Sequence, residues 1–133
     1  MLTSLVGSEM CIRDRPNVVL LGDFNEDPDD DNVLLLESAG LTNLMMDMID
    51  KNDVSTYIYR ANNYLYDQII VSNSILDEKG FTLADSTAYI LDLPKYRQQK
   101  GKYKNYPFRF WAGNKLLGGY SDHLAVKADF VIK

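Results

Sequence analysis

Residues 17–25 have the sequence NVVLLGDFN, an apolar run followed by a short polar segment. The run from Val18 to Leu21 is rich in β-branched and other apolar side chains, and Gly22 and Asp23 close it. This is the pattern of a buried strand that ends in a polar loop, so we expect such a strand over residues 17–24. In an extended segment Asp23 and Asn25 point to the same side, where a carboxylate and an amide can converge on one small group.

The rest of the chain predicts one helix and further strands. A turn rich in proline and acids precedes a helix that we expect over residues 30–39, with Gly40 as its C-terminal stop. Further strands are expected over residues 66–72 and 81–90. Residues 44–59 have no clean period and support no assignment.

The last predicted strand covers residues 124–132, where apolar and polar side chains alternate. This alternation is typical of a half-buried or edge strand with one face turned to the core. The residues expected on that face are Leu124, Val126, Ala128, Phe130 and Ile132.

A long loop is expected over residues 91–120, and between Leu93 and Ser121 it has no acidic residue. Its basic and aromatic side chains can steer and stack a phosphorylated ligand. A solvated surface loop pinned to the core by its aromatics explains them equally well. Because loops near thirty residues are uncommon in compact domains unless functional, we expect a substrate-facing role. The expected substrate-binding residues are Lys100, Lys102 and Arg109.

The 133-residue chain, 46% of it hydrophobic, fits one globular domain with a core. Its formal net charge of -5 argues against a dedicated DNA-binding module, which usually has a basic surface. This charge does not exclude an enzyme that holds one phosphate through a metal. The longest apolar runs, such as residues 18–21 and 33–36, are far shorter than the roughly 20 residues of a membrane helix, so we expect no transmembrane segment.

Residues 1–15 lack the basic start and unbroken apolar stretch of a secretory signal, so they predict no localisation. The run MCIRDR at residues 10–15 resembles an in-frame translation of a transposon end used to prepare sequencing libraries. We therefore expect residues 1–15 to be a non-native leader before a native part at 16–133. Cys11, the single cysteine, falls in this run and gives no information on disulfides or metal.

Several polar residues have the chemistry of a hydrolytic phosphate site. The carboxylate of Asp23 can orient or deprotonate a water, and the amide of Asn25 can donate a hydrogen bond to an anionic oxygen. Asp67 lies in an apolar strand, where a free charge is unfavourable without a partner. His123, the only histidine, is the candidate partner, and the adjacent Asp122 suits a hard cation such as Mg²⁺. Singly, each residue also has an ordinary structural explanation, such as a turn or an ion pair.

A calcium loop of the EF-hand type is an alternative for the acidic segment, because acidic or amide residues alternate over positions 23–31. However, Pro28 stands where that loop requires glycine, and Leu34 stands where it requires a bidentate glutamate. We therefore reject a calcium loop.

Three segments in this order, GDFN at 22–25, YDQI at 66–69 and SDH at 121–123, resemble the motifs of the endonuclease/exonuclease/phosphatase superfamily. Its members include pancreatic deoxyribonuclease, abasic-site endonucleases, sphingomyelinases and inositol-polyphosphate phosphatases. The segment YPFRF at 106–110 is similar to bacterial members of uncharacterised substrate. The resemblance implies an α/β fold in which residues 16–133 are the C-terminal half of a four-layered α/β sandwich with mainly antiparallel sheets.

The resemblance also implies a role for each matched residue. Asp23 would position the attacking water and Asn25 would hold a phosphoryl oxygen. His123 would stabilise charge on the pentacovalent phosphate, with Asp67 orienting its ring, and Asp122 would approach the metal. The implied cofactor is Mg²⁺, with Mn²⁺ as an alternative, and the implied substrate is a phosphate ester: a nucleic acid, a phospholipid head group or a sugar phosphate.

The chain also departs from the family pattern. Ala125 replaces a proline common after the histidine. The family draws a metal-binding asparagine and glutamate and a further catalytic histidine from an N-terminal half, and no residue before Asn17 matches them. We therefore expect an incomplete fragment, nearly inactive alone, of a metal-dependent hydrolase. The alternative is a non-catalytic fragment that binds a phosphate ligand without turnover.

Overall fold

The computed structural model describes residues 16–133. The expectation of a non-native leader at residues 1–15, with Cys11, lies outside this range. The centre of the fold is a three-stranded antiparallel sheet in the order β1-β5-β2. Its strands are β1 (Val19–Asp23), β5 (Asp67–Ser72) and β2 (Leu41–Asn43).

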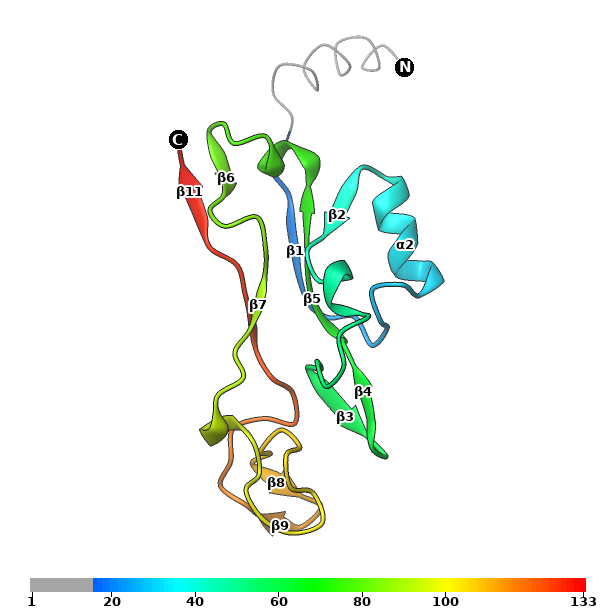
Figure 1. Cartoon of the computed structure of the whole chain (residues 1–133), viewed down its shortest axis with the longest axis vertical. Helices are drawn as coiled ribbons and strands as arrows, with labels where there is room; N and C mark the ends of the chain where they lie inside the picture. Colours follow the sequence, from blue (N-terminus) through cyan, green and yellow to red (C-terminus); the bar gives the residue numbers. More distant parts are fainter. Residues whose placement is uncertain (1–15) are drawn as a thin grey trace.

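Strand β5 lies in the middle of this sheet because its sequence is apolar on both faces. Ile69 and Val71 belong to the main hydrophobic cluster, and Ile70, which alternates with them, is also fully buried. The helix α2 (Asp31–Ser38) follows β1, begins after Asp30 and flanks the sheet beside β2 (Figure 1). The predicted strand at 66–72 and helix at 30–39 are therefore confirmed.

Four short strands form two further antiparallel pairs. β6 (Phe81–Leu83) pairs with β11 (Phe130–Ile132), and β7 (Tyr89–Ile90) pairs with β10 (Val126–Lys127), both antiparallel. Figure 1 shows β6, β7 and β11 on one side of the molecule and β1, β5, β2 and α2 on the other.

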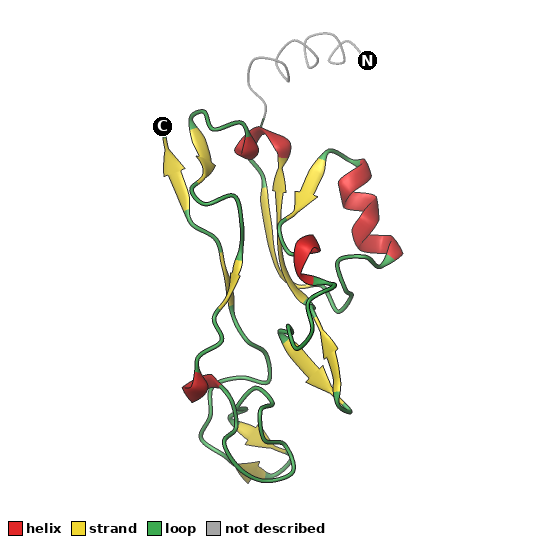
Figure 2. Cartoon of the chain, in the orientation of Figure 1, coloured by secondary structure: helices red, strands yellow, loops and turns green. Residues whose placement is uncertain are grey.

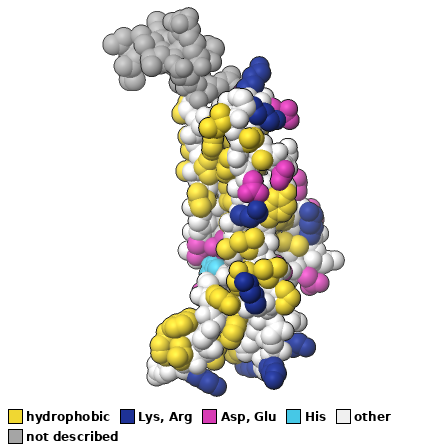
Figure 3. Space-filling model, turned by 90° about the vertical axis from the view of Figure 1, so that its left-hand side faces the viewer, with side chains coloured by type: hydrophobic (Ala, Val, Ile, Leu, Met, Phe, Trp, Pro, Cys, Tyr) yellow, Lys and Arg dark blue, Asp and Glu magenta, His cyan; other side chains and the backbone are white. Residues whose placement is uncertain are grey.

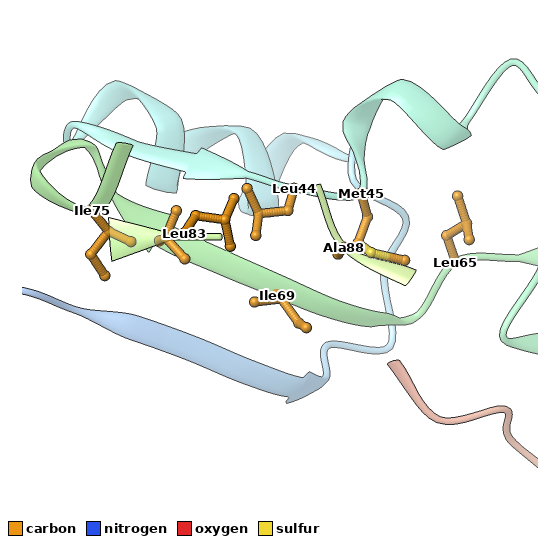
Figure 4. Packing of buried hydrophobic residues seen from close by; sticks show 8 residues of the cluster. Leu44, Met45, Leu65, Ile69, Ile75, Leu83 and Ala88 are labelled. Atoms are coloured by element: carbon orange, nitrogen blue, oxygen red, sulfur yellow. The ribbon is translucent and has the colours of Figure 1, made fainter. Parts of the chain in front are cut away.

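The main hydrophobic cluster draws on both groups of strands, and Figure 4 shows its labelled side chains lying along β5. Val126 of β10 and Phe130 of β11 pack against it, with Phe130 stacked on Phe81 at 5.1 Å. The buried members of the cluster are Leu44, Met45, Leu65, Ile69, Val71, Ile75, Leu83 and Ala88.

Two hairpins extend beyond these strands. One joins β3 (Tyr57–Tyr59) to β4 (Asn62–Tyr64), and the other joins β8 (Trp111–Ala112) to β9 (Lys115–Leu116). Figure 2 shows that loops connect most of the short strands, and the remaining helical turns are single 3-10 turns. These turns are η1 (Met46–Met48), η2 (Asn73–Leu76) and η3 (Pro94–Tyr96).

One helix with many antiparallel strands is an α/β fold with mainly antiparallel sheets, as predicted. Within residues 16–133, no helix has both the length and the apolar character needed to cross a membrane.

Four details of the sequence predictions are wrong. The single strand expected over residues 124–132 is two short strands, β10 and β11, which pair with different partners, β7 and β6. Strand β1 has only one neighbour in the sheet, so Leu21 is 68% exposed rather than buried. The single strand expected over 81–90 is two strands, because the chain leaves β6 and turns through Ser86 at a φ of 57°. Ile132, expected on the core face, is 81% exposed, because β11 pairs only with β6 and the core ends at Phe130.

The segment expected to be a plain loop, residues 91–120, has its own local structure. It contains η3 and the β8-β9 hairpin, and Arg97 bridges Pro107 across it. Arg97 also binds the carboxylate of Asp92 with two hydrogen bonds of 2.5 and 2.8 Å. One cation of this basic segment is therefore already paired within the protein.

Candidate active site

The ends of β1 and β5 place two carboxylates side by side. Asp23 is the last residue of β1, Asp67 is the first of β5, and the antiparallel register pairs them directly. Asp67 is the more buried, with a side chain 16% exposed against 39% for Asp23. Like charges opposite each other in a sheet are unfavourable, so this arrangement calls for a donor or cation between them.

The His123 imidazole, 22% exposed, fills that position. Its Nδ1 lies 2.6 Å from Asp67 Oδ2, within hydrogen-bond distance, and its Nε2 lies 3.9 Å from Asp23 Oδ2, beyond it. Figure 3 shows the histidine side chain at the surface beside acidic side chains. The contact that the sequence predicted between Asp67 and His123 is present.

This geometry fixes the chemistry of the ring. A carboxylate only accepts hydrogen bonds, so His123 Nδ1 carries a proton and donates the hydrogen bond that Asp67 accepts. The hydrogen bond at Nδ1 sets the tautomer and leaves Nε2 facing Asp23. Because 3.9 Å is too long for a direct hydrogen bond, both Nε2 and the Asp23 carboxylate can still bind a third group.

The β3 strand holds the imidazole in place. The ring of Tyr57 stacks on the His123 ring with centroids 4.6 Å apart and planes inclined by 22°, and the two residues form an isolated antiparallel bridge. The Leu124 N–H donates to the Thr56 carbonyl at 2.7 Å. Thr56 is fully buried, and its Oγ1 accepts the Asp67 N–H at 3.1 Å. Strand β3 and Thr56, the residue before it, thus support both members of the pair.

Asn25 departs from the geometry expected of an extended segment. Its φ of 54° lies in the left-handed region, so the alternation of a strand does not carry through to it. Its backbone N–H donates to Asp23 Oδ1 at 2.8 Å, a local turn that asparagine tolerates well. The expectation that Asp23 and Asn25 point the same way because the chain is extended is therefore wrong, although the two residues are in contact.

A buried amide that the sequence analysis assigned no role ties this loop to the sheet. Gln68 is fully buried; its Nε2 donates to the carbonyls of Glu26 at 2.5 Å and Leu65 at 2.9 Å. Its Oε1 accepts from Asn43 Nδ2 at 2.8 Å. The one feature of the sequence that indicates a role for Gln68 is its position, as a polar residue next to the apolar run of its strand. The network fixes the segment after Asp23 against β5.

Asp27 lies in the same loop, and its Oδ1 accepts the Leu65 N–H at 2.6 Å. Burial raises the pKa of its carboxyl above the ordinary 3.8, and the charges of Asp30 and Asp29 raise it further, while the hydrogen bond from Leu65 opposes them. Asp27 therefore holds the loop and is destabilised in its charged form.

Asp122, the predicted metal ligand, is exposed at the surface, next to His123 in the chain. Within residues 16–133, no three His, Cys, Asp or Glu side chains lie close enough together to hold a metal ion. Magnesium can be held by one or two protein carboxylates with waters and substrate oxygens, so Asp122 can supply one ligand. The described residues do not by themselves form a complete metal site.

The three predicted substrate-binding residues lie in the segment before the SDH motif. Lys100 and Lys102 are exposed, Arg109 is half-buried, and Lys102 lies over the ring of Tyr103 at 5.3 Å. Among residues 16–133, no hydrogen bond or ion pair joins their side chains to the Asp67–His123 pair. Their substrate-binding role stays a prediction.

A close backbone contact positions the SDH motif. Gly119 is buried against the carbonyl of Phe108, where a Cβ atom would overlap the oxygen. The same oxygen accepts the N–H groups of Tyr120 at 2.6 Å and Ser121 at 3.2 Å, and Ser121 Oγ accepts the His123 N–H at 3.0 Å. The glycine therefore lets the aromatic segment hold the chain that leads into His123.

Comparison with known proteins identifies a family for most of the chain. A model of the Endonuclease/Exonuclease/phosphatase family matches residues 2–131, a range that contains both strand-end carboxylates and His123. No curated protein and no solved structure gave a significant match.

Proposed function

The chain belongs to the endonuclease/exonuclease/phosphatase family, a family of phosphate-ester hydrolases, and from this we propose that Asp23, Asn25, Asp67 and His123 carry out metal-dependent hydrolysis of a phosphate ester. The observation that supports the proposal best is the imidazole placed between two carboxylates, hydrogen-bonded to Asp67 and open toward Asp23.

In the proposed reaction, Asp23 orients a water and accepts the proton that it loses. The water oxygen forms a new bond to phosphorus, and the bond from phosphorus to the ester oxygen breaks. Asn25 donates a hydrogen bond from its side-chain amide to a phosphoryl oxygen. Charge grows on the pentacovalent phosphate, and His123 stabilises it as an imidazolium, donating a hydrogen bond from Nε2 to the phosphate and one from Nδ1 to Asp67.

We propose Mg²⁺, or Mn²⁺ in its place, as the cofactor, with Asp122 as one oxygen ligand. Such a cation supplies charge neutralisation at the phosphate. Because residues 16–133 form no complete metal cluster, we propose that further ligands come from outside them and that this range is part of a larger catalytic domain. The substrate is a nucleic acid, a phospholipid head group or a sugar phosphate.

A second candidate function is binding of a phosphate ligand without turnover. The absence of a metal cluster among the described residues favours it, since the pair around His123 can still bind an anion. The two candidates differ in whether a chromogenic phosphodiester is hydrolysed when metal is added.

The test is hydrolysis of bis(p-nitrophenyl) phosphate under Mg²⁺ titration and with EDTA, by this chain and by a version extended with its upstream coding sequence. We expect the extended protein to be active only with metal and this chain to be nearly silent. Equal rates for both would remove the need for outside ligands, and metal-saturated extended protein without activity would favour the binding function.

Variants at Asn25 must respect its backbone. Because Asn25 has a positive φ, Asn25→Ala adds backbone strain to the loss of the amide, whereas Asn25→Gly removes the amide alone. We expect Asn25→Gly to lower kcat more than it raises KM, because the contact strengthens as charge develops. An unchanged kcat would contradict the proposed role.

A further inference from the structure

A small hollow opens beside His123, where the segment after β7 meets the SDH motif. Its volume is about 180 Å³, and the His123 ring is part of its wall. It is lined by Leu91, Tyr96, Tyr120, Ser121, His123, Leu124 and Ala125.

The walls of the hollow are mainly apolar and aromatic. The rings of Tyr96 and Tyr120 meet edge to face with centroids 5.2 Å apart, and Tyr120 is 62% exposed. Leu91 is also 38% exposed. No Lys, Arg, Asp or Glu side chain is among the lining residues. An exposed aromatic surface that curves inward is typical of a site for a small ligand.

The His123 ring belongs both to the candidate active site and to the wall of the hollow. Tyr57 covers one face of the His123 ring and does not line the hollow. A group in the hollow therefore contacts a part of the ring that Tyr57 leaves uncovered. A phosphate bound between His123 and Asp23 would share the His123 ring with the hollow. A group attached to that phosphate can enter it.

We propose that this hollow binds one flat, uncharged aromatic ring carried by the phosphate ester. The inference rests on the proposed function, because it assigns the substrate of the same site. The volume of about 180 Å³ is below the ≈ 300–1,000 Å³ of pockets for whole drug-sized ligands, so it fits a single ring. No Lys or Arg side chain lines the hollow, which disfavours a ring that carries several phosphates, because such a ring needs those side chains.

Two sources can supply such a ring, a nucleobase or a simple aryl group, and both use the same stacking chemistry. A choline head group is a different ligand, because its cation binds an aromatic cage instead. The Lys95 ammonium already lies over the Tyr96 ring, 4.9 Å from its centroid, and competes with such a cation for that ring.

The test is a binding titration on the chain as it stands, followed by NMR of its single histidine. The probes are thymidine and adenosine for the nucleobase, phenyl phosphate for the aryl group, and phosphocholine and inositol hexakisphosphate as comparisons. We expect thymidine, adenosine or phenyl phosphate to shift the imidazole proton signals saturably. Nucleosides alone or phenyl phosphate alone would identify the source of the ring.

Tyr120 supplies the decisive variants. We expect Tyr120→Leu to weaken binding of the ring probes by about tenfold, because one aromatic stack on a base has an effect of that order, and Tyr120→Phe to retain it. The matched control is Tyr103→Leu, since Tyr103 is 48% exposed in the same segment but does not line the hollow.

Preferential binding of phosphocholine or inositol hexakisphosphate would overturn the inference, as would unchanged affinity in Tyr120→Leu. Both results leave the proposed hydrolysis standing, because that is tested by the loss of metal-dependent activity in His123→Ala. Loss of that activity in His123→Ala, together with ring binding by the native chain, supports both proposals separately.

Discussion

Gln68 should be a main source of stability for the loop that carries the candidate site. The variant Gln68→Met keeps the length and approximate volume of the side chain and removes its three hydrogen bonds. It leaves the carbonyls of Glu26 and Leu65 and the amide of Asn43 without this partner in the interior. A buried polar group without a partner costs about 1–3 kcal/mol. Because a carbonyl oxygen has a second lone pair, we take about 1 kcal/mol for each group, or about 3 kcal/mol in all.

The assay is urea unfolding followed by the fluorescence of Trp111, with free energies compared at equal m-values. A loss of about 3 kcal/mol is large against the ≈ 5–15 kcal/mol of a typical domain. The control is Gln99→Met, because the Gln99 amide also donates two hydrogen bonds but is exposed, and its loss should stay within about 0.5 kcal/mol. If Gln68→Met were no more destabilising than Gln99→Met, the buried network would not hold the loop.

Three further predictions follow from the site. Tyr57→Leu should lower the occupancy of the hydrogen bond from His123 Nδ1 to Asp67, seen as loss of the downfield NMR signal of the Nδ1 proton. Tyr57→Phe keeps the stacked ring and should keep the signal. Equal spectra for the two variants would show that the stack does not position the His123 ring. Gly119→Ala should destabilise the chain by about 1–3 kcal/mol in urea unfolding, because the new Cβ overlaps the Phe108 carbonyl, and unchanged stability would refute that close contact. The raised pKa of Asp27 means that the folded state binds more protons than the unfolded state from about pH 3.8 up to the folded pKa, so its contribution to stability is lost as pH rises through this window. The free energy of unfolding of Asp27→Asn, relative to that of the native chain, should therefore increase as pH rises through this window. A relative free energy that decreases instead would mean that the pKa of Asp27 is lowered on folding.

The sequence predicted the elements whose pattern is local. The helix after β1 has an acidic start and Gly40 at its end, and β5 contains the apolar run Ile69 to Val71, so the pattern predicts both elements correctly. The burial of β1 could not be predicted in this way. An apolar run shows that a segment tends to be buried, but the rest of the chain decides how many strands lie beside it. Strand β1 has one neighbouring strand, β5, and its residue Leu21 is exposed.

The candidate site was predictable in its members and less so in its geometry. An acid in an apolar strand needs a partner, and the chain offers one histidine, so the Asp67–His123 contact followed from composition. The left-handed turn at Asn25 did not, because it depends on a local hydrogen bond to Asp23. The stack of Tyr57 on His123 was also not predicted. Tyr57 lies in the segment 44–59, which has no periodicity, and it is far from His123 in the sequence.

The measurement that tests the proposed function most directly is a double-mutant cycle on Asp67 and His123. The rate to follow is Mg²⁺-dependent hydrolysis of bis(p-nitrophenyl) phosphate by the extended protein. We expect Asp67→Asn and His123→Ala each to lower kcat by about 10²-fold or more, because the pair acts on developing charge as one unit. The double variant should then be little slower than the slower single variant. Losses that multiply, or a His123→Ala variant with full activity, would contradict a catalytic pair at the ends of β1 and β5.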